Sequence, residues 1–300
     1  MTGLGALIRR NTKLYFHDKG MFFTSLITPV ILLILYSTFL GNVFESSFRS
    51  ALDAAGAAVS DELIRGCVGG QLVSSLLAVS CVTVAFCSNL LMVQDKITGA
   101  RRDLTIAPLK PSTLALSYYL ATMLSTLLVC LTATAVCLVY LANVGWYLAA
   151  SDVAKLLLDV FLLVLFGTAL SSCVNFPLST NGQASAVGTS VSAGYGFICG
   201  AYMPISQFSD GLQKVISFLP GTYATSLLRN HAMRGVFSEM GNQGFPPEVV
   251  EAIKDSVDCN LYFFGSKVPL SNMYLILSGS VVAAVAIYVA MNVLLRSRQK

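Results

Sequence analysis

Long apolar runs separated by short polar stretches dominate this sequence. Runs long enough to cross a bilayer as helices lie at 20–43, 69–93, 113–143, 156–174, 184–204 and 271–295. The hydrocarbon core of a bilayer is about 30 Å thick and takes roughly 20 apolar residues per helical crossing. The pattern therefore predicts an all-α membrane protein with six transmembrane helices, organised as one domain over 1–300.

The first 19 residues have a different, amphipathic pattern. Apolar side chains recur at helical spacing from Leu4 to Tyr15, while Arg9, Arg10 and Lys13 fall on the other side. We expect residues 1–19 to form a helix that lies in the inner membrane surface, with its cations toward anionic headgroups. A frayed basic tail is the alternative.

The largest polar segment is 205–269, and it has helical periodicity in pieces. Phe208 to Leu219 and Tyr223 to Met233 each have one apolar side, which predicts two short helices that re-enter the outer leaflet. A third piece opens at Pro246 with acidic residues in its first turns, as expected for a solvated outer helix. The shorter polar segment 45–65 is expected to be a loop.

Composition and charge place the chain in a membrane and orient it. The sequence is 55% hydrophobic and only 11% charged. Both ends together with loop 94–112 hold eleven basic and three acidic residues, whereas the remainder holds eight basic and twelve acidic residues. Cytoplasmic loops carry the excess of Lys and Arg. We therefore expect a multi-pass protein of the cell membrane with both termini in the cytoplasm.

Several kinds of chemistry are absent from the sequence. It contains no G-x-x-x-x-G-K-[ST] phosphate loop, so we expect no ATPase site in this chain. Most of its cysteines lie in apolar runs without metal-ligand spacing, and its two histidines are isolated, so no metal site is expected. Only Cys67 and Cys259 fall on the outer side. A disulfide between them is an alternative if the compartment is oxidising.

The loop at 94–112 mixes charged residues with an apolar ridge. A short helix there would present Lys96, Arg101 and Arg102, with Leu104, to a cytoplasmic partner, and Pro108 would end it. The alternative is a loop held inside by its charge alone, because any membrane permease needs such charges.

Two features of the apolar runs suggest further roles. Small residues recur every four positions along the fifth run and predict a close subunit or gate interface, with packing inside one subunit as the alternative; they are Ala184, Gly188, Ser192, Gly196 and Gly200. Asp159 is a carboxylate inside an apolar run. We interpret it as an ion pair with Lys155 one turn earlier, and proton coupling is the alternative.

The order of these parts resembles the permeases of type-2 ABC exporters over nearly the whole chain. The sharpest similarity lies in Thr98 to Leu109 after the second run, and in Gly200 to Pro204 with Phe218 to Tyr223 after the fifth. The resemblance implies that Leu4 to Tyr15 is the connecting helix, that 96–106 includes the coupling helix, and that 208–233 forms the outer re-entrant hairpin.

The same resemblance assigns roles to individual residues. It implies ATPase coupling by Asp95, Lys96, Thr98, Gly99, Arg101, Arg102, Asp103, Leu104 and Pro108. It implies a helix interface at Gly188, Ser192, Gly196 and Gly200, and an outer gate at Met203, Pro204, Leu219, Pro220 and Tyr223.

The resemblance also implies partners. Two permeases, identical or paralogous, would work with an ABC ATPase subunit dimer that binds ATP and Mg, while this chain binds no cofactor itself. The apolar, aromatic runs favour export of an amphiphile, such as a drug, a lipid, a lipid-linked glycan or a peptide. Membrane lipid is an expected partner and nucleic acid is not. A gradient-driven secondary transporter or channel is the alternative function.

Overall fold

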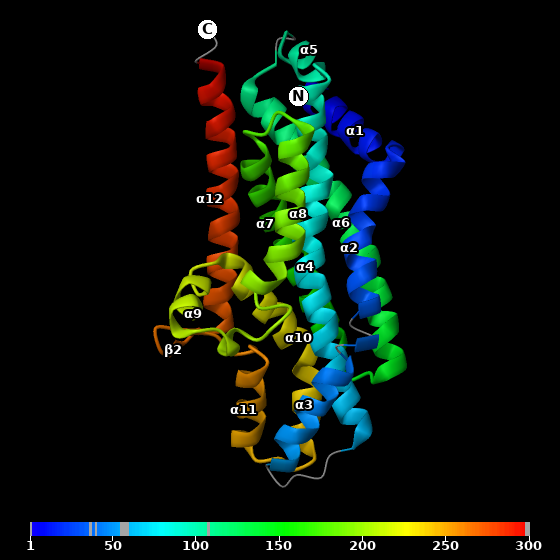
Figure 1. Cartoon of the computed structure of the whole chain (residues 1–300), viewed down its shortest axis with the longest axis vertical. Coiled ribbons are helices and arrows are strands. Elements are labelled where there is room, and N and C mark those ends of the chain that lie inside the picture. Colours follow the sequence, from blue (N-terminus) through cyan, green and yellow to red (C-terminus); the bar gives the residue numbers. More distant parts are fainter. Residues whose placement is uncertain (1, 36–37, 40, 55–59, 107–108, 298–300) are drawn as a thin grey trace.

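A computed structural model describes residues 2–35, 38–39, 41–54, 60–106 and 109–297. Long helices run side by side along one axis, and short elements gather at both ends (Figure 1). The start of α1 and the end of α12 lie at the same end as the short helix α5, while α3 and α11 lie at the opposite end. An all-α membrane protein is thus confirmed.

The N-terminal segment forms two helices joined at a sharp bend. α1 (Thr2–His17) and α2 (Lys19–Leu35) meet at 77°. The Asp18 carboxylate accepts a hydrogen bond from the Met21 amide at 3.0 Å and so caps α2. The predicted amphipathic helix is present: Leu7 and Tyr15 are buried, whereas Arg9 and Lys13 are exposed. α1 packs on α6.

The segment that follows α2 is helical where a loop was predicted. α3 (Gly41–Ala54) is amphipathic, with Phe48 buried on one side. Arg49 pairs with Glu45 one turn earlier and with Asp61 across the connection, both at 2.8 Å. The i,i+4 pair of Glu45 and Arg49 favours a helix, and the loop prediction for 45–65 is wrong over most of its length.

α4 (Asp61–Ile97) is the central element, and α2, α6, α7, α8 and α10 pack around it. Its most apolar window is 89% buried. The Ser60 hydroxyl accepts a hydrogen bond from the Leu63 amide at 3.3 Å and caps its start. The helix is therefore longer than the predicted run 69–93 at both ends.

The other long helices are α6 (Pro111–Val144), α7 (Ala150–Asn175), α8 (Asn181–Ile198) and α12 (Leu270–Ser297). The first three pack on α4, and α12 packs on α6, α7 and α10.

Four helices in the described part of the chain are long and apolar enough to cross a membrane, namely α4, α6, α7 and α12, and a fifth is counted if α1 and α2 form one bent span. The predicted six is not confirmed. α2 has only 17 residues. α8 has polar residues in its first turn and many Gly and Ser residues, which lower its mean hydropathy.

The segment 205–269 contains more structure than expected. After a 3₁₀ turn at Ile205–Gln207 come α9 (Asp210–Ile216), α10 (Pro220–Asn242) and α11 (Pro247–Ser256), then a hairpin of β1 (Tyr262–Phe263) and β2 (Ser266–Lys267). α10 begins at a proline, as helices often do, and extends well beyond the predicted 223–233. It packs on α4, α7 and α12 and belongs to the bundle.

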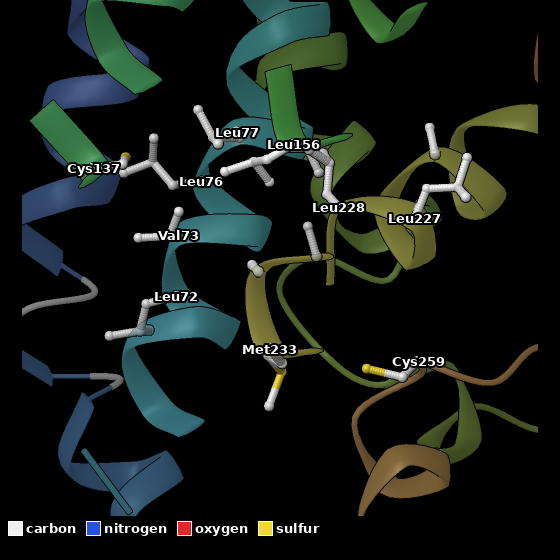
Figure 2. Packing of buried hydrophobic residues seen from close by; sticks show 14 of the residues in the cluster. Leu72, Val73, Leu76, Leu77, Cys137, Leu156, Leu227, Leu228, Met233 and Cys259 are labelled. Atoms are coloured by element: carbon white, nitrogen blue, oxygen red, sulfur yellow. The ribbon is translucent and has the colours of Figure 1, made fainter. Parts of the chain in front are cut away.

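The main core lies between α4 and its neighbours. Figure 2 shows Leu72, Val73, Leu76 and Leu77 of α4 among side chains of α6, α7 and α10. Cys67 and Cys259 are both buried free thiols, so the suggested disulfide is absent. Burial raises the pKa of the Cys259 thiol to about 12.

Candidate functional site

The predicted coupling loop forms a short helix beyond the end of α4. Thr98 donates its hydroxyl to the Gln94 carbonyl at 2.9 Å and ends α4. Gly99 has a φ of +84°, a left-handed conformation that a residue with a Cβ adopts only at a cost. α5 (Ala100–Ile106) therefore starts in a new direction and caps this end of the bundle (Figure 1).

Asp95 lies inside the chain. Its carboxylate accepts hydrogen bonds from two guanidinium nitrogens of Arg10, at 2.7 and 3.1 Å, and from the Tyr118 hydroxyl at 2.6 Å. Charge-assisted, two-pronged contacts of this kind are strong and geometrically specific. The contact joins α1 to α4 and α6, so Asp95 can act on a partner only through α1 and Arg10.

Lys96 and Arg101 also turn toward their own chain. The Lys96 ammonium donates to the Phe176 carbonyl and, at 2.9 Å, to the Leu178 carbonyl, which lie just beyond the C-terminus of α7. Arg101 donates to the Asn292 side chain at 3.1 Å. Both cations sit over the Phe176 ring, 5.2 and 5.5 Å from its centre. α5 is thereby fixed to α7 and α12.

The outer side of α5 is open. Arg102 and Asp103 are exposed, and Ile106 is 83% exposed, which is unusual for an isoleucine. Leu104, on the opposite side of α5, packs against the smaller of two clusters of buried apolar residues. The exposed surface of α5 thus carries charges and an apolar side chain. Pro108 lies outside the described residues.

The small-residue stripe of α8 is divided between two environments. Gly188 is half-buried with open space beside its Cα, and Ser192 is half-buried. A Cβ on Gly196 would collide with the Tyr202 ring, and Gly200 has a φ of +73° beside Ile205. Gly196 and Gly200 therefore serve packing within this chain, whereas Gly188 and Ser192 leave α8 accessible to another helix.

The predicted outer-gate residues surround the turn between α9 and α10. Leu219 precedes α10 and Pro220 is its first residue. The buried Tyr223 donates its hydroxyl to the Ser217 carbonyl at 2.5 Å, which closes the turn. Met203 and Pro204 are half-buried in the connection after α8. Leu219, Pro220 and Tyr223 thus lie together at the start of α10, whereas Met203 and Pro204 lie in the earlier connection.

A buried arginine joins the outer elements, and the sequence pattern did not single it out. Arg229 on α10 is only 1% exposed. It pairs with Asp258 at 3.1 Å and donates to the carbonyls of Gly200 at 2.5 Å and Val257 at 3.0 Å. Asp258 also accepts from the Ile205 amide at 2.8 Å. One charged pair therefore holds the C-terminal ends of α8 and α11 against the middle of α10.

Asp159 has partners other than the one predicted. Its carboxylate lies 2.5 Å from Nδ1 of His231 on α10 and accepts from the Tyr274 hydroxyl on α12 at 2.6 Å. Lys155 is exposed and forms no ion pair with it, so that interpretation is wrong. Helical spacing shows only neighbours along one helix, whereas these contacts cross three helices.

Within the described residues, no group of three or more His, Cys, Asp or Glu side chains could hold a metal ion. Asp159 and His231 make a two-residue cluster, and Asp258 is committed to Arg229. The described contacts of these groups join helices of the bundle to one another.

Comparison with known proteins agrees with this arrangement. A family model described as "ABC-2 type transporter" matches residues 2–232, from the first turn of α1 into α10. A search of curated proteins gave no match.

Proposed function

Because the chain belongs to the ABC-2 type transporter family, we propose that it is the membrane permease of an exporter whose ATP hydrolysis takes place in a separate ABC ATPase chain. The matched region covers more than three quarters of the sequence, and no phosphate loop occurs anywhere in it. An ABC transporter permease without its own ATPase site needs a surface through which to receive force.

The observation that carries this proposal is that α5 is anchored to the bundle on one side and exposed on the other. Arg101 and Leu104 attach its inner side to α7, α12 and the core, while Arg102, Asp103 and Ile106 are exposed. A partner that moves α5 therefore moves the end of α4 as well. We assign the exposed side of α5 to ATPase docking, with Arg102 and Asp103 as its charged contacts.

The Arg10 and Asp95 pair extends this assignment to α1. Because α1 packs on α6 and its Arg10 reaches Asp95 next to the turn into α5, a displacement of α5 is passed to α1 as well. This fits the role of a connecting helix that responds to the ATPase together with the coupling helix.

We propose that a second permease, identical or paralogous, packs against α8 and α2. The α8 residues Gly188 and Ser192 permit a close helix approach. Phe23, Ile27 and Ile31 of α2 are more than half exposed in the single chain. A path between two such apolar faces suits an amphiphilic cargo better than a hydrophilic ion.

Gentle purification of the tagged chain, followed by identification of stoichiometric companions, tests the proposal. A chain carrying a phosphate loop is expected. The variant Arg102→Glu with Asp103→Lys should lose permease-stimulated ATP turnover while still inserting into membranes. Its control is the same exchange on α9, Lys214→Glu with Asp210→Lys, which lies at the opposite side of the membrane domain. Undiminished turnover in the α5 variant contradicts the docking assignment.

The buried Asp159 and His231 pair favours one alternative, a gradient-driven transporter. Ionisable groups within a membrane domain often mark proton paths. If no ATPase accompanies the chain and cargo flux in vesicles follows an imposed pH gradient, the alternative replaces the proposal.

A further inference from the structure

A cationic groove of about 950 Å³ lies underneath α5. Side chains from α5, the start of α6, the end of α7 and α12 line it. Its cations are Lys96, Arg101, Arg102 and Lys110, and its apolar surface includes Leu104, Leu114 and Phe176. Among the described residues that line it, none is a carboxylate.

Among the described residues, no carboxylate pairs with the cations of the groove. Asp95 is the acidic residue next to Lys96, but Arg10 and Tyr118 already occupy its oxygens. Lys96 and Arg101 share the single ring of Phe176, so two like charges are held close together. Such an arrangement is unfavourable until an anion approaches.

Arg101 provides a second, independent observation. Its Nη2 donates to Asn292, whereas its Nη1 is buried and has no hydrogen-bond partner. A buried donor left unpaired costs free energy comparable to a lost hydrogen bond. Arg102 and Lys110 are exposed, and no described residue pairs with their side chains. Three cations thus have donor capacity left for a ligand.

We propose that this groove binds the phosphate group of an anionic lipid from the inner leaflet. Arg and Lys are the usual phosphate-binding side chains, and basic pockets between membrane helices on the cytoplasmic side bind anionic headgroups. The volume lies within the range of small-molecule sites, roughly 300–1,000 Å³.

The surroundings of the groove favour a lipid over a soluble anion. The candidate spans α4, α6, α7 and α12 all contribute to it or end beside it. The most apolar window of α12 is only 17% buried, so apolar surface is available next to the groove for acyl chains. The bound headgroup would bridge α5 to α6 and steady the coupling helix. The site belongs to this chain alone and does not depend on the ATPase assignment.

The test uses the purified full chain in detergent, without any ATPase, and measures bound lipid by native mass spectrometry as the mole fraction of lipid is raised. Phosphatidylglycerol should saturate one site per chain, whereas phosphatidylcholine with the same acyl chains and inorganic phosphate alone should not. The variant Arg102→Gln with Lys110→Gln should raise the half-saturating mole fraction roughly 30-fold, because each cation near an anionic headgroup contributes about a factor of five.

A matched variant controls for general surface charge. Arg9→Gln with Lys13→Gln removes two exposed cations from α1 and should shift the half-saturating mole fraction by less than about threefold, because α1 does not line the groove. Equal losses in the two variants, or equal binding of both lipids, would overturn the proposal. Saturation by inorganic phosphate alone would also overturn it, because the apolar floor would then have no role. Unchanged lipid binding in the groove variant would likewise overturn it, because the cations of the groove would then have no part in binding the lipid.

Discussion

Replacement of Gly235 by alanine should separate α10 from the turn between α6 and α7. A Cβ built on Gly235 would lie 1.7 Å from the carbonyl oxygen of Tyr147 and 2.6 Å from its carbonyl carbon. Both obstructing atoms belong to the backbone, so a side-chain rotation cannot clear them. Gly241, also on α10, has nothing within 4 Å of the same position and provides a matched control.

The magnitude follows from these distances. Ordinary van der Waals contact begins at 3.4 Å, so the two backbones must move apart by well over 1 Å. Overpacking of a filled interior costs typically 1–3 kcal/mol, and a backbone collision belongs at the upper end, so we expect a loss of about 3 kcal/mol in the free energy of unfolding. This corresponds to a fall in Tm of roughly 6–12 °C. Gly241→Ala should instead add about 0.5 kcal/mol through helix propensity.

Thermal unfolding of the full chain in detergent, followed by helical circular dichroism, gives the comparison directly. The expected order of Tm is Gly241→Ala at or above the wild type, with Gly235→Ala well below it. If the two variants melted within about 2 °C of each other, the close seating of α10 on Tyr147 would be refuted.

Three further predictions concern charged groups. Arg229→Met should lower the free energy of unfolding by about 3–5 kcal/mol because it leaves Asp258 buried and unpaired. Adding Asp258→Asn should recover part of this loss in a double-mutant cycle. Strictly additive losses would show that the pair is not coupled. If the Asp159 cluster only holds helices together, Asp159→Asn should leave ATP-driven transport intact, as should the exposed control Lys155→Gln. Loss of transport in Asp159→Asn alone would contradict this structural role. Hydrogen bonding to lysines lowers the pKa of Glu251 below its ordinary 4.5. The ionised carboxylate therefore contributes to stability above pH 4.5, and this contribution is lost as the pH falls through the lowered pKa. Hydrogen exchange in α11 should rise on acidification in the wild type but not in Glu251→Gln.

Much of the helical architecture could be predicted from the sequence, because apolar runs and helical periodicity are local signals. The boundaries of α6, α7 and α12 lie close to the predicted runs. α3 was missed because a short amphipathic helix rich in Ala and Ser has the composition of a loop. The prediction of six spans is not confirmed, because an apolar run does not show that its helix is long enough or apolar enough throughout.

In the candidate site, too, local features could be predicted from the sequence and contacts between distant residues could not. The position of α5 could be predicted because Gly99 and the change from apolar to charged residues mark the break after α4. The inward direction of Lys96 and Arg101 could not be, since their partners Phe176 and Asn292 are distant in sequence. The Arg229 and Asp159 contacts were missed for the same reason.

The length and packing of α4 determine where this molecule is able to deform. Its 37 residues make a rod of about 55 Å, with α5 at one end and the contacts of Gly66 and Gly70 with Tyr147 and Met233 at the other. It contains no proline and runs as one continuous helix, and α6, α7 and α10 pack along it. We therefore expect a displacement of α5 to tilt or slide α4 as a unit together with these neighbours. α8 packs mainly on α4, and α2 on α4 and α1, so relative movement between helices is expected there first.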